Sequence, residues 1–164
     1  MRIVLDTNIW VYAMRQEENN KHLLECVTII SNFLQTKSDD LAVDTGREIL
    51  KEYADNLKDA QAFQVMLMQL RNENRIQYVD AGLPQKITKR LDSFHFHEAE
   101  DRIFLGTAYN SDKYLITDDS DYNVGDKPGN EEAYRYFTEE LGMQILGPAE
   151  GADDTRKRMV RSVD

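Results

Sequence analysis

The chain of 164 residues has the length of one domain, and its 41% hydrophobic and 30% charged residues are typical of a globular protein. Its formal net charge of −10 argues against a sequence-independent grip on nucleic acid, which normally needs a basic face. That argument weakens if several carboxylates bind a divalent cation, because the ion reverses the local field. The single cysteine, Cys26, excludes an internal disulfide and a cysteine-bound zinc cluster.

No apolar run approaches the roughly 18 residues of a membrane span. The chain enters an apolar segment almost at once, so we expect no signal peptide and a cytoplasmic protein. In chain order, the expected strands are Ile3–Leu5, Leu41–Val43, Ile76–Val79, Tyr114–Ile116 and Met143–Leu146. Between them, apolar periodicity predicts helices over Ile9–Arg15, His22–Gln35, Thr45–Leu57, Ala60–Glu73, Pro84–Phe94, Glu98–Asn110 and Glu131–Leu141.

Short apolar strands of this kind are typical of a sheet that is covered on both faces. Their alternation with helices predicts an α/β fold with a parallel, doubly wound sheet. We assign residues 1–148 to this domain and residues 149–164 to a polar tail, which contains the chain's basic cluster. We interpret the tail as a frayed or weakly helical end; the alternative is a contact for RNA or for a protein partner.

Acidic residues follow two of the expected strands. Ile3–Leu5 ends in Asp6, and Tyr114–Ile116 is followed by the acidic segment 117–121. Ligands bind at the carboxyl ends of strands in open parallel sheets, so these acids would meet where a ligand is expected. Their mutual repulsion predicts a cation between them. Asp6 taken alone could equally cap the following helix, although Thr7 or Asn8 could serve as that cap.

Asp101 is the strongest single candidate, because it falls within the apolar stripe of its expected helix. A carboxylate on a buried face is costly without a partner, which favours a bound cation there. In the helix expected over Thr45–Leu57, Glu52 lies at the edge of the core face, whereas Glu48 points to the opposite side. Glu52 is therefore the better candidate of the two by a modest margin.

The acids after the fourth strand leave a choice open. Successive residues point in opposite directions at a strand end, so Asp118 and Asp119 are not expected to serve the same ion. Asp119 and Asp121 could share one side, and the alternative is a polar turn closed by an Asx-type bond. His95 and His97 are weak evidence for zinc, because two histidines lack a convincing third ligand.

Other chemistries lack their sequence signals: the chain has no glycine-rich phosphate loop and no G-x-S-x-G nucleophile elbow. The remaining feature is a set of carboxylates from separate segments, and such hard oxygen ligands select Mg²⁺ or Mn²⁺. Two such ions are the usual machinery for in-line attack of water on a phosphodiester, and whether this chain would hold one or two stays open.

Two of these segments carry a family resemblance. Arg2–Asn8 resembles the first strand and the Asp-Thr-Asn signature of the PIN domain superfamily of metal-dependent nucleases, in particular prokaryotic PIN proteins described as toxins. Tyr114–Tyr122 resembles the fourth motif, a strand that ends in Thr-x-Asp-x-Asp-aromatic. This similarity selects Asp119 as a ligand and Asp121 as its helper.

The second and third motifs are matched more loosely. Glu48–Tyr53 resembles the helix whose glutamate, Glu52 here, precedes an aromatic residue or a leucine. Asp101–Ala108 resembles the third motif, an aspartate followed by a helix that ends in a small residue. The family often has serine or threonine before the second-motif helix, where this chain has Gly46.

The resemblance implies a three-layer α/β/α fold with strand order 3-2-1-4-5. It also implies a ribonuclease whose Mg²⁺ or Mn²⁺ is held, directly or through water, by Asp6, Glu52, Asp101 and Asp119. Residues that would orient ligands or substrate are Asn8, Thr117 and Asp121. Relatives suggest an antitoxin protein as a partner and a homodimer, and the RNA that is cut stays open.

Three other functions compete with this hypothesis. One is a module that keeps the fold without catalysis and binds RNA or protein, although the complete set of acids disfavours it. Another is a nuclease directed at DNA. The third is a phosphoryl-transfer enzyme with Asp6 as nucleophile, but such enzymes usually need a second acid two residues on, where this chain has Asn8.

Overall fold

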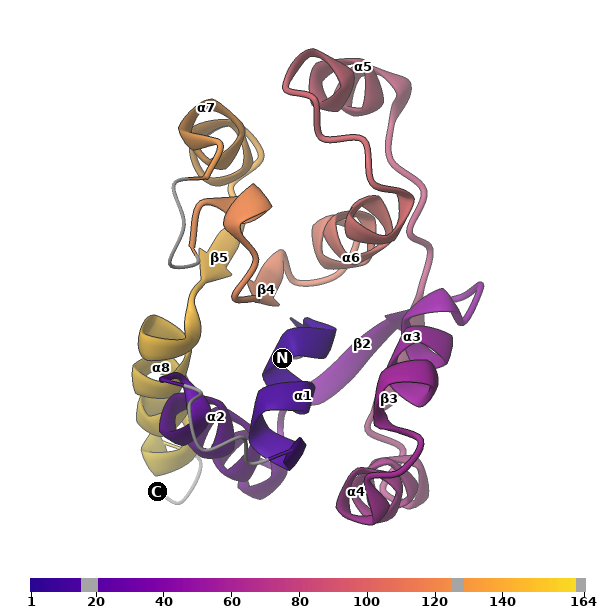
Figure 1. Cartoon of the computed structure of the whole chain (residues 1–164), viewed down its shortest axis with the longest axis vertical. Coiled ribbons are helices and arrows are strands. Elements are labelled where there is room, and N and C mark those ends of the chain that lie inside the picture. The colour runs from indigo at the N-terminus through magenta and orange to yellow at the C-terminus, as the bar shows by residue number, and fades with distance from the viewer. Residues whose placement is uncertain (16–20, 125–128, 162–164) are drawn as a thin grey trace.

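The computed structural model describes residues 1–15, 21–124 and 129–161, which form an α/β fold on a five-stranded parallel sheet (Figure 1). The strands are β1 (Arg2–Leu5), β2 (Asp40–Asp44), β3 (Ile76–Val79), β4 (Tyr114–Ile116) and β5 (Gln144–Leu146). Their order is β3-β2-β1-β4-β5 and every pairing is parallel. The predicted fold class and strand order are confirmed, and each strand lies within one residue of its expected limits.

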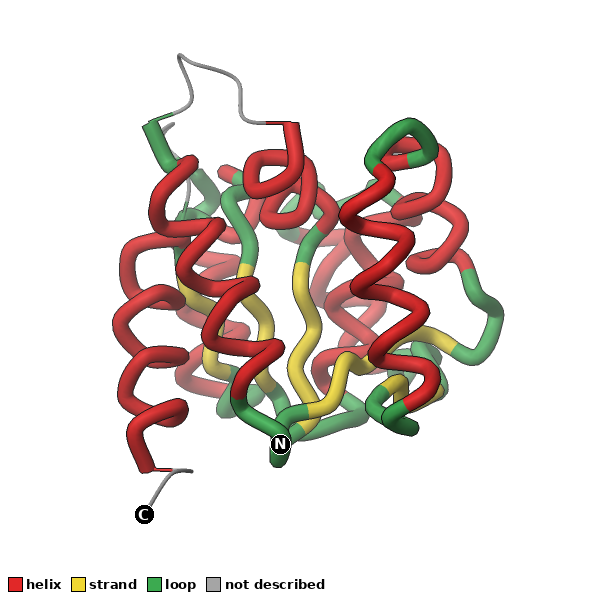
Figure 2. The backbone as a smooth tube through the Cα atoms, turned by 90° about the horizontal axis from the view of Figure 1, so that it is seen from below, coloured by secondary structure: helices red, strands yellow, loops and turns green. Residues whose placement is uncertain are grey.

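Helices lie on both sides of the strands (Figure 2). The α-helices are α1 (Thr7–Arg15), α2 (Leu23–Gln35), α3 (Glu48–Leu57), α4 (Gln61–Asn72), α5 (Gln85–Ser93), α6 (Ala99–Tyr109), α7 (Glu131–Arg135) and α8 (Pro148–Arg161). A 3₁₀ turn, η1, covers Ser120–Tyr122, and a π-helical turn, η2, covers Tyr136–Glu140. None of the described helices is long and apolar enough to cross a membrane.

The helix expected over Glu131–Leu141 is divided into α7 and η2. The Thr138 hydroxyl donates to the Tyr134 carbonyl at 2.9 Å, and the amide of Leu141 bonds five residues back to Tyr136 at 3.0 Å. A threonine that competes for a helix carbonyl bends the helix, and the ladder shifts from four-residue to five-residue spacing here. The single helix predicted from periodicity is therefore wrong in its second half.

Helix α3 begins at Glu48 rather than at the expected Thr45, because Asp44 caps it. The buried Asp44 carboxylate accepts the amides of Ile49 at 2.8 Å and Glu48 at 3.1 Å. A Cβ at Gly46 would lie 2.9 Å from Asp44 Oδ2, so a larger residue there would crowd this cap. The cap from Asp44 replaces a serine or threonine before the helix, and it accounts for the glycine.

The interpretation of the C-terminal segment as frayed or weakly helical is wrong for residues 148–161. Helix α8 packs along α2 (Figure 1) and buries Gly151, Ala152 and Thr155. A Cβ at Gly151 would come within 2.8 Å of the Ile116 side chain, so the helix approaches β4 closely. This narrow stripe of small residues allows α8 to lie close to β4. It could not be recognised from the sequence because the segment is polar on average.

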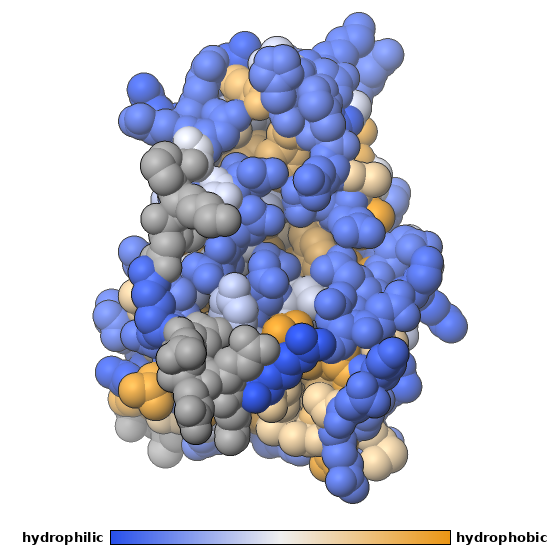
Figure 3. Space-filling model, viewed as in Figure 1, coloured by the Kyte–Doolittle hydropathy of each residue, from blue (hydrophilic) through white to orange (hydrophobic). Residues whose placement is uncertain are grey.

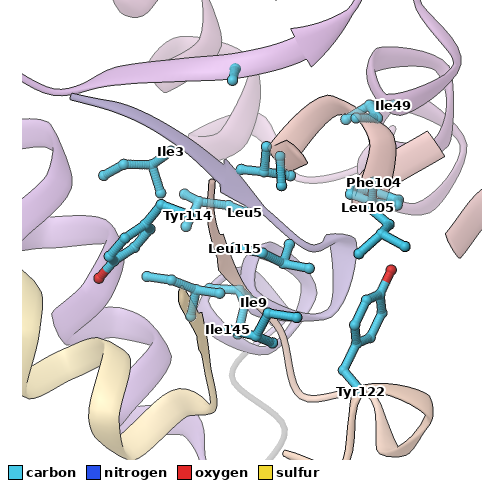
Figure 4. Close-up of a cluster of buried hydrophobic side chains, with 14 of the residues drawn as sticks. Ile3, Leu5, Ile9, Ile49, Phe104, Leu105, Tyr114, Leu115, Tyr122 and Ile145 are labelled. Atoms are coloured by element: carbon cyan, nitrogen blue, oxygen red, sulfur yellow. The ribbon is translucent and has the colours of Figure 1, made fainter. Parts of the chain in front are cut away.

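The core lies around β1 and β4. Ile3, Val4 and Leu5 of β1 have no exposed surface, nor have Leu115 and Ile116 of β4 (Figure 4). Strands buried on both faces must be apolar throughout, which is the signal that identified them in the sequence. Outside this core, hydrophilic residues cover most of the face seen in Figure 3, and hydrophobic residues show in smaller patches. The acids at the carboxyl ends of β1 and β4 thus lie at the border of this buried apolar core.

Candidate functional site

Asp6 and Thr117 join the carboxyl ends of β1 and β4. Asp6 is 8% exposed, and its amide donates to the Ile116 carbonyl at 2.9 Å, which continues the pairing of the two strands. The Thr117 hydroxyl is fully buried; it donates to Asp6 Oδ2 and accepts the amide of Asp119 at 3.0 Å. One hydroxyl therefore fixes the relative position of two of the predicted ligands, Asp6 and Asp119.

The alternative role of Asp6 as a helix cap accounts for only part of its surroundings. Its Oδ1 faces the amide of Asn8 at 3.5 Å, which is the long limit for a hydrogen bond. Neither Thr7 nor Asn8 caps the helix, because both lie inside α1. The carboxylate thus stands at the helix start with one weak amide bond, and its other oxygen is held by Thr117.

Glu52 is brought near Asp6 by its neighbour Tyr53. The buried Tyr53 hydroxyl donates to the carbonyl of Leu5, which ties α3 to the end of β1. Glu52 is half-buried, and burial raises its pKa against the opposing effect of the neighbouring Thr7 hydroxyl. Glu48 is exposed and pairs with Lys51 at 3.6 Å. Glu48 and Glu52 lie one helical turn apart and both line the cavity described below, but Glu52 is the one whose charge acts on Asp6.

Asp101 lies in the first turn of α6, and η1 holds it in place. The Tyr122 hydroxyl, directed toward α6 in Figure 4, donates to the Asp101 carbonyl at 2.8 Å. Phe104, Leu105 and Ala108 are buried on the same helix, as the apolar stripe predicted. Because Tyr122 follows Asp121 directly, the segment that carries Asp119 and the helix that carries Asp101 are anchored to each other.

The acids after β4 divide between two sides. Asp119 Oδ1 accepts the amide of Asp121 at 2.8 Å, so the Asx-type turn is present, and Asp119 at the same time faces the other acids. Asp118 points toward α2, where it lies 3.8 Å from His22 Nε2. This agrees with the expectation that Asp118 and Asp119 do not contribute to the same ion site.

The carboxylates of this cluster repel one another. Burial raises the pKa of Asp6 to about 6, and the charges of Asp119 and Glu52 add to that rise against the hydrogen bond from Thr117. Burial raises the pKa of Asp101 to about 8, and Asp119 is the strongest of the acids that contribute. Burial also raises the pKa of Glu52 and of Asp121. No cation of the described residues is among the causes of these shifts, so the protein itself does not offset the repulsion between the ionised acids.

The donors of this cluster are all oxygen atoms, which suits Mg²⁺ or Mn²⁺ better than softer metals. Within the described residues, no three His, Cys, Asp or Glu side chains are arranged to hold a metal ion. Mg²⁺ usually keeps several waters and uses only one or two protein carboxylates together with substrate phosphate, so a closed cage is not required. The residues present therefore fit a partly hydrated ion rather than a fully protein-bound one.

A cavity of about 220 Å³ opens beside this cluster. It lies between α3 and α6 and is lined by both acidic and apolar residues: Glu48, Ile49, Lys51, Glu52, Asp55, Asn56, Glu100, Ile103 and Phe104. Its position makes Glu52 accessible from solvent. The cavity gives a ligand a route to the half-buried side of the acid cluster.

His95 and His97 stand apart from these acids. Both are exposed, their rings meet at 5.6 Å, and His97 lies 3.9 Å from Asp92. Sequence reasoning did not foresee the positioning roles of Tyr53 and Tyr122. Each aromatic residue directly follows an acid of the cluster, and that adjacency is the signal that could have identified them.

The comparisons with known proteins give no identity: no protein-family model, no curated protein and no solved structure matches this chain. The strand order and the acid cluster are therefore the observations on which a function has to be argued.

Proposed function

We propose that this protein is a Mg²⁺- or Mn²⁺-dependent endoribonuclease of the PIN superfamily that hydrolyses RNA phosphodiester bonds. The observation that carries the proposal is the Thr117 hydroxyl, which links Asp6 to the segment of Asp119 at the junction of β1 and β4. That junction is where the strand order reverses direction, and ligands bind there in open α/β sheets. The family assignment is supported by the four resembling segments and by the order of the strands.

The acids Asp6, Glu52, Asp101 and Asp119 would hold the ion, directly or through water. Their unneutralised charge supports this role, because a divalent cation would lower the pKa of each neighbouring carboxyl and remove the repulsion. When bound, the ion supplies an activated water and stabilises the charge that develops on the scissile phosphate.

The other residues of the site act by positioning. Thr117 fixes one oxygen of Asp6 and leaves the other with only the long contact to the Asn8 amide. Tyr122 fixes the start of α6 and with it Asp101. Asn8 and Asp121 stand next to the ligands and would orient ligands or substrate. The protein supplies no covalent nucleophile in this scheme.

Cleavage of a fluorescent single-stranded RNA in Mg²⁺ or Mn²⁺ tests the proposal. We expect the wild-type protein to cut, and we expect Asp6→Asn and Glu52→Gln to lose activity while they stay folded. Asp59→Asn is the control, because Asp59 is an exposed acid outside the cavity that Glu52 lines. Equal loss in Asp59→Asn and in the two site variants, or cutting by clean Asp6→Asn protein, contradicts the assigned roles. Preference for DNA over RNA of the same sequence contradicts RNA as the substrate.

A toxin role, with an antitoxin partner in the cytoplasm, extends the proposal and rests on the resemblance. Induced expression tests it: the wild-type chain is expected to arrest growth, whereas Asp6→Asn is not. Arrest by both proteins alike contradicts a toxin that acts through cleavage. A homodimer is a further expectation, and sedimentation of the purified chain tests it.

A further inference from the structure

A basic hollow lies beside α5, along a face of that helix other than the one that carries its buried residues. It has a volume of about 400 Å³ and lies between α5 and η2. Its lining, which we call the α5–η2 hollow, consists of Lys86, Lys89, Arg90, Ser93, Tyr136 and Glu140. The four α5 residues are spaced at i, i+3, i+4 and i+7, so they share one face of that helix. Ile87 and Leu91, on another face, are buried in the core.

The cations of this hollow are available to a ligand. Lys86 and Lys89 are exposed, and neither has an ion-pair partner within residues 1–15, 21–124 and 129–161. By contrast, two other lysines have acidic partners: Lys37 lies 2.7 Å from Glu73, and Lys51 lies 3.6 Å from Glu48. In a chain of net charge −10, such a group of unpaired cations around a concave surface favours an anionic ligand.

Arg90 is held in position before any ligand arrives. Its guanidinium lies 4.6 Å from the centre of the Phe94 ring and 5.8 Å from that of Tyr136. Glu132 approaches it at 3.6 Å, but both side chains are largely exposed and such a pair contributes little. A planar guanidinium that is already oriented favours phosphate, whose oxygens it can bind in pairs.

Packed aromatic rings connect the hollow to the acid cluster. Phe94 ends α5, and its carbonyl accepts the Asn130 side chain at 2.8 Å. Two residues on, the Phe96 ring meets the Tyr122 ring at 5.2 Å. Tyr122 in turn donates to the carbonyl of Asp101. A polymer held at the hollow would therefore have a fixed position relative to the acids.

We propose that the α5–η2 hollow binds phosphates of the RNA substrate's backbone, away from the bond that is cut. This inference rests on the proposed nuclease function and adds the surface that offsets the repulsion between a polyanion and an acidic protein. Lys86 and Lys89 each contact a phosphate, and Arg90 aligns the strand. Glu140, at the rim, restricts where the strand can pass.

Binding of a fluorescent single-stranded RNA to metal-free Asp6→Asn protein tests this inference separately from cleavage. We expect Lys86→Ala/Lys89→Ala in that background to bind about tenfold more weakly and to reduce the slope of log affinity against log salt by about 1.4, since each lost phosphate contact removes about 0.7. The control is Lys37→Ala/Lys58→Ala, which removes the same charge elsewhere and is expected to leave the slope unchanged.

An unchanged slope in Lys86→Ala/Lys89→Ala, or an equal change in the control, overturns the inference. So does binding of polyglutamate that depends on these lysines when binding of RNA does not, because the hollow would then be a site for an acidic protein. If the slope changes as expected but the wild-type protein cuts no RNA, the hollow stands and the nuclease proposal fails. If RNA is cut and the slope does not change, the nuclease proposal stands and the inference about the hollow fails.

Discussion

At the scale of single residues, Thr117 is the side chain on which the geometry of the acids depends most. Replacing it by valine keeps its shape but leaves Asp6 without its strongest hydrogen bond. We expect Thr117→Val to lower cleavage about 10- to 100-fold, the usual effect of losing a group that orients a metal ligand. We also expect it to lower the free energy of unfolding by about 2 kcal/mol.

Thr107→Val is the matched control for this change. Thr107 is also fully buried, and its hydroxyl has no hydrogen-bond partner among the described residues. Removing an unpaired buried hydroxyl leaves activity and stability unchanged or raises stability slightly. Urea unfolding and initial cleavage rates measure both variants, and equal effects in the two would contradict the role of Thr117.

The raised pKa of Asp101 predicts that the free energy of unfolding of the metal-free protein depends on pH. Its pKa is raised from 3.8 to about 8, so the folded state binds its proton more tightly than the unfolded state does. The contribution of this group to stability therefore falls as pH rises from about 4 to about 8. With EDTA present, Asp101→Asn should exceed the wild type in free energy of unfolding at pH 8 by at least about 1 kcal/mol, the value of one pKa unit.

That advantage should shrink toward pH 4, where the carboxyl is protonated in both states. Asp59→Asn is the control, because Asp59 is an exposed acid that is not among the charges that raise the pKa of Asp101. An advantage of Asp101→Asn that does not depend on pH would mean that the desolvated charge is not its cause.

The acids of the site could be predicted from the sequence, whereas the residues that position them could not. Asp6 and Asp119 follow apolar strands, and Asp101 interrupts an apolar stripe; these are local signals. Thr117 acts on Asp6 from 111 residues away, and Tyr122 acts on a carbonyl of another helix. Such roles depend on which strands are neighbours, and single-sequence periodicity does not contain that information.

At the scale of elements, α8 belongs to the core, and Gly151 tests this directly. Alanine normally favours a helix over glycine, yet a Cβ here would press on Ile116 at 2.8 Å and Ile29 at 3.2 Å. We expect Gly151→Ala to cost about 1–3 kcal/mol through overpacking. For a domain of this size, each kcal/mol lowers the melting temperature by about 2–4 °C.

Glu150→Ala is the control for this substitution, since Glu150 is exposed on the same helix. Calorimetry of the two variants gives the comparison. A melting temperature that rises in Gly151→Ala would show that α8 does not rest closely on β4.

The strands and most helices were predictable, because buried strands and amphipathic helices each have a distinct periodicity. The exceptions share a physical cause. The π-helical turn η2 depends on a hydroxyl that competes for a carbonyl, α3 starts where Asp44 caps it, and α8 packs through glycine and alanine. In each case a few atoms decide the outcome, and a hydrophobic pattern averaged over a segment does not record them.

At the scale of the whole molecule, acidic and basic side chains gather at two separate sites. Within the described residues, no cation is among the groups that shift the pKa of the acids at the ends of β1 and β4, whereas Lys86 and Lys89 of the α5–η2 hollow have no ion-pair partner in an otherwise acidic chain. The first would attract a divalent metal ion and the second a polyanion. A nuclease needs both, and the net charge of −10 conceals this division.

Anomalous scattering from Mn²⁺-soaked crystals tests the central claim most directly, because it locates the ion without relying on activity. We predict a peak bounded by Asp6, Asp101 and Asp119, and its loss in crystals of Asp6→Asn. A peak confined to other acids of the surface, or a saturating Mn²⁺ concentration that leaves this cluster empty, would contradict the account.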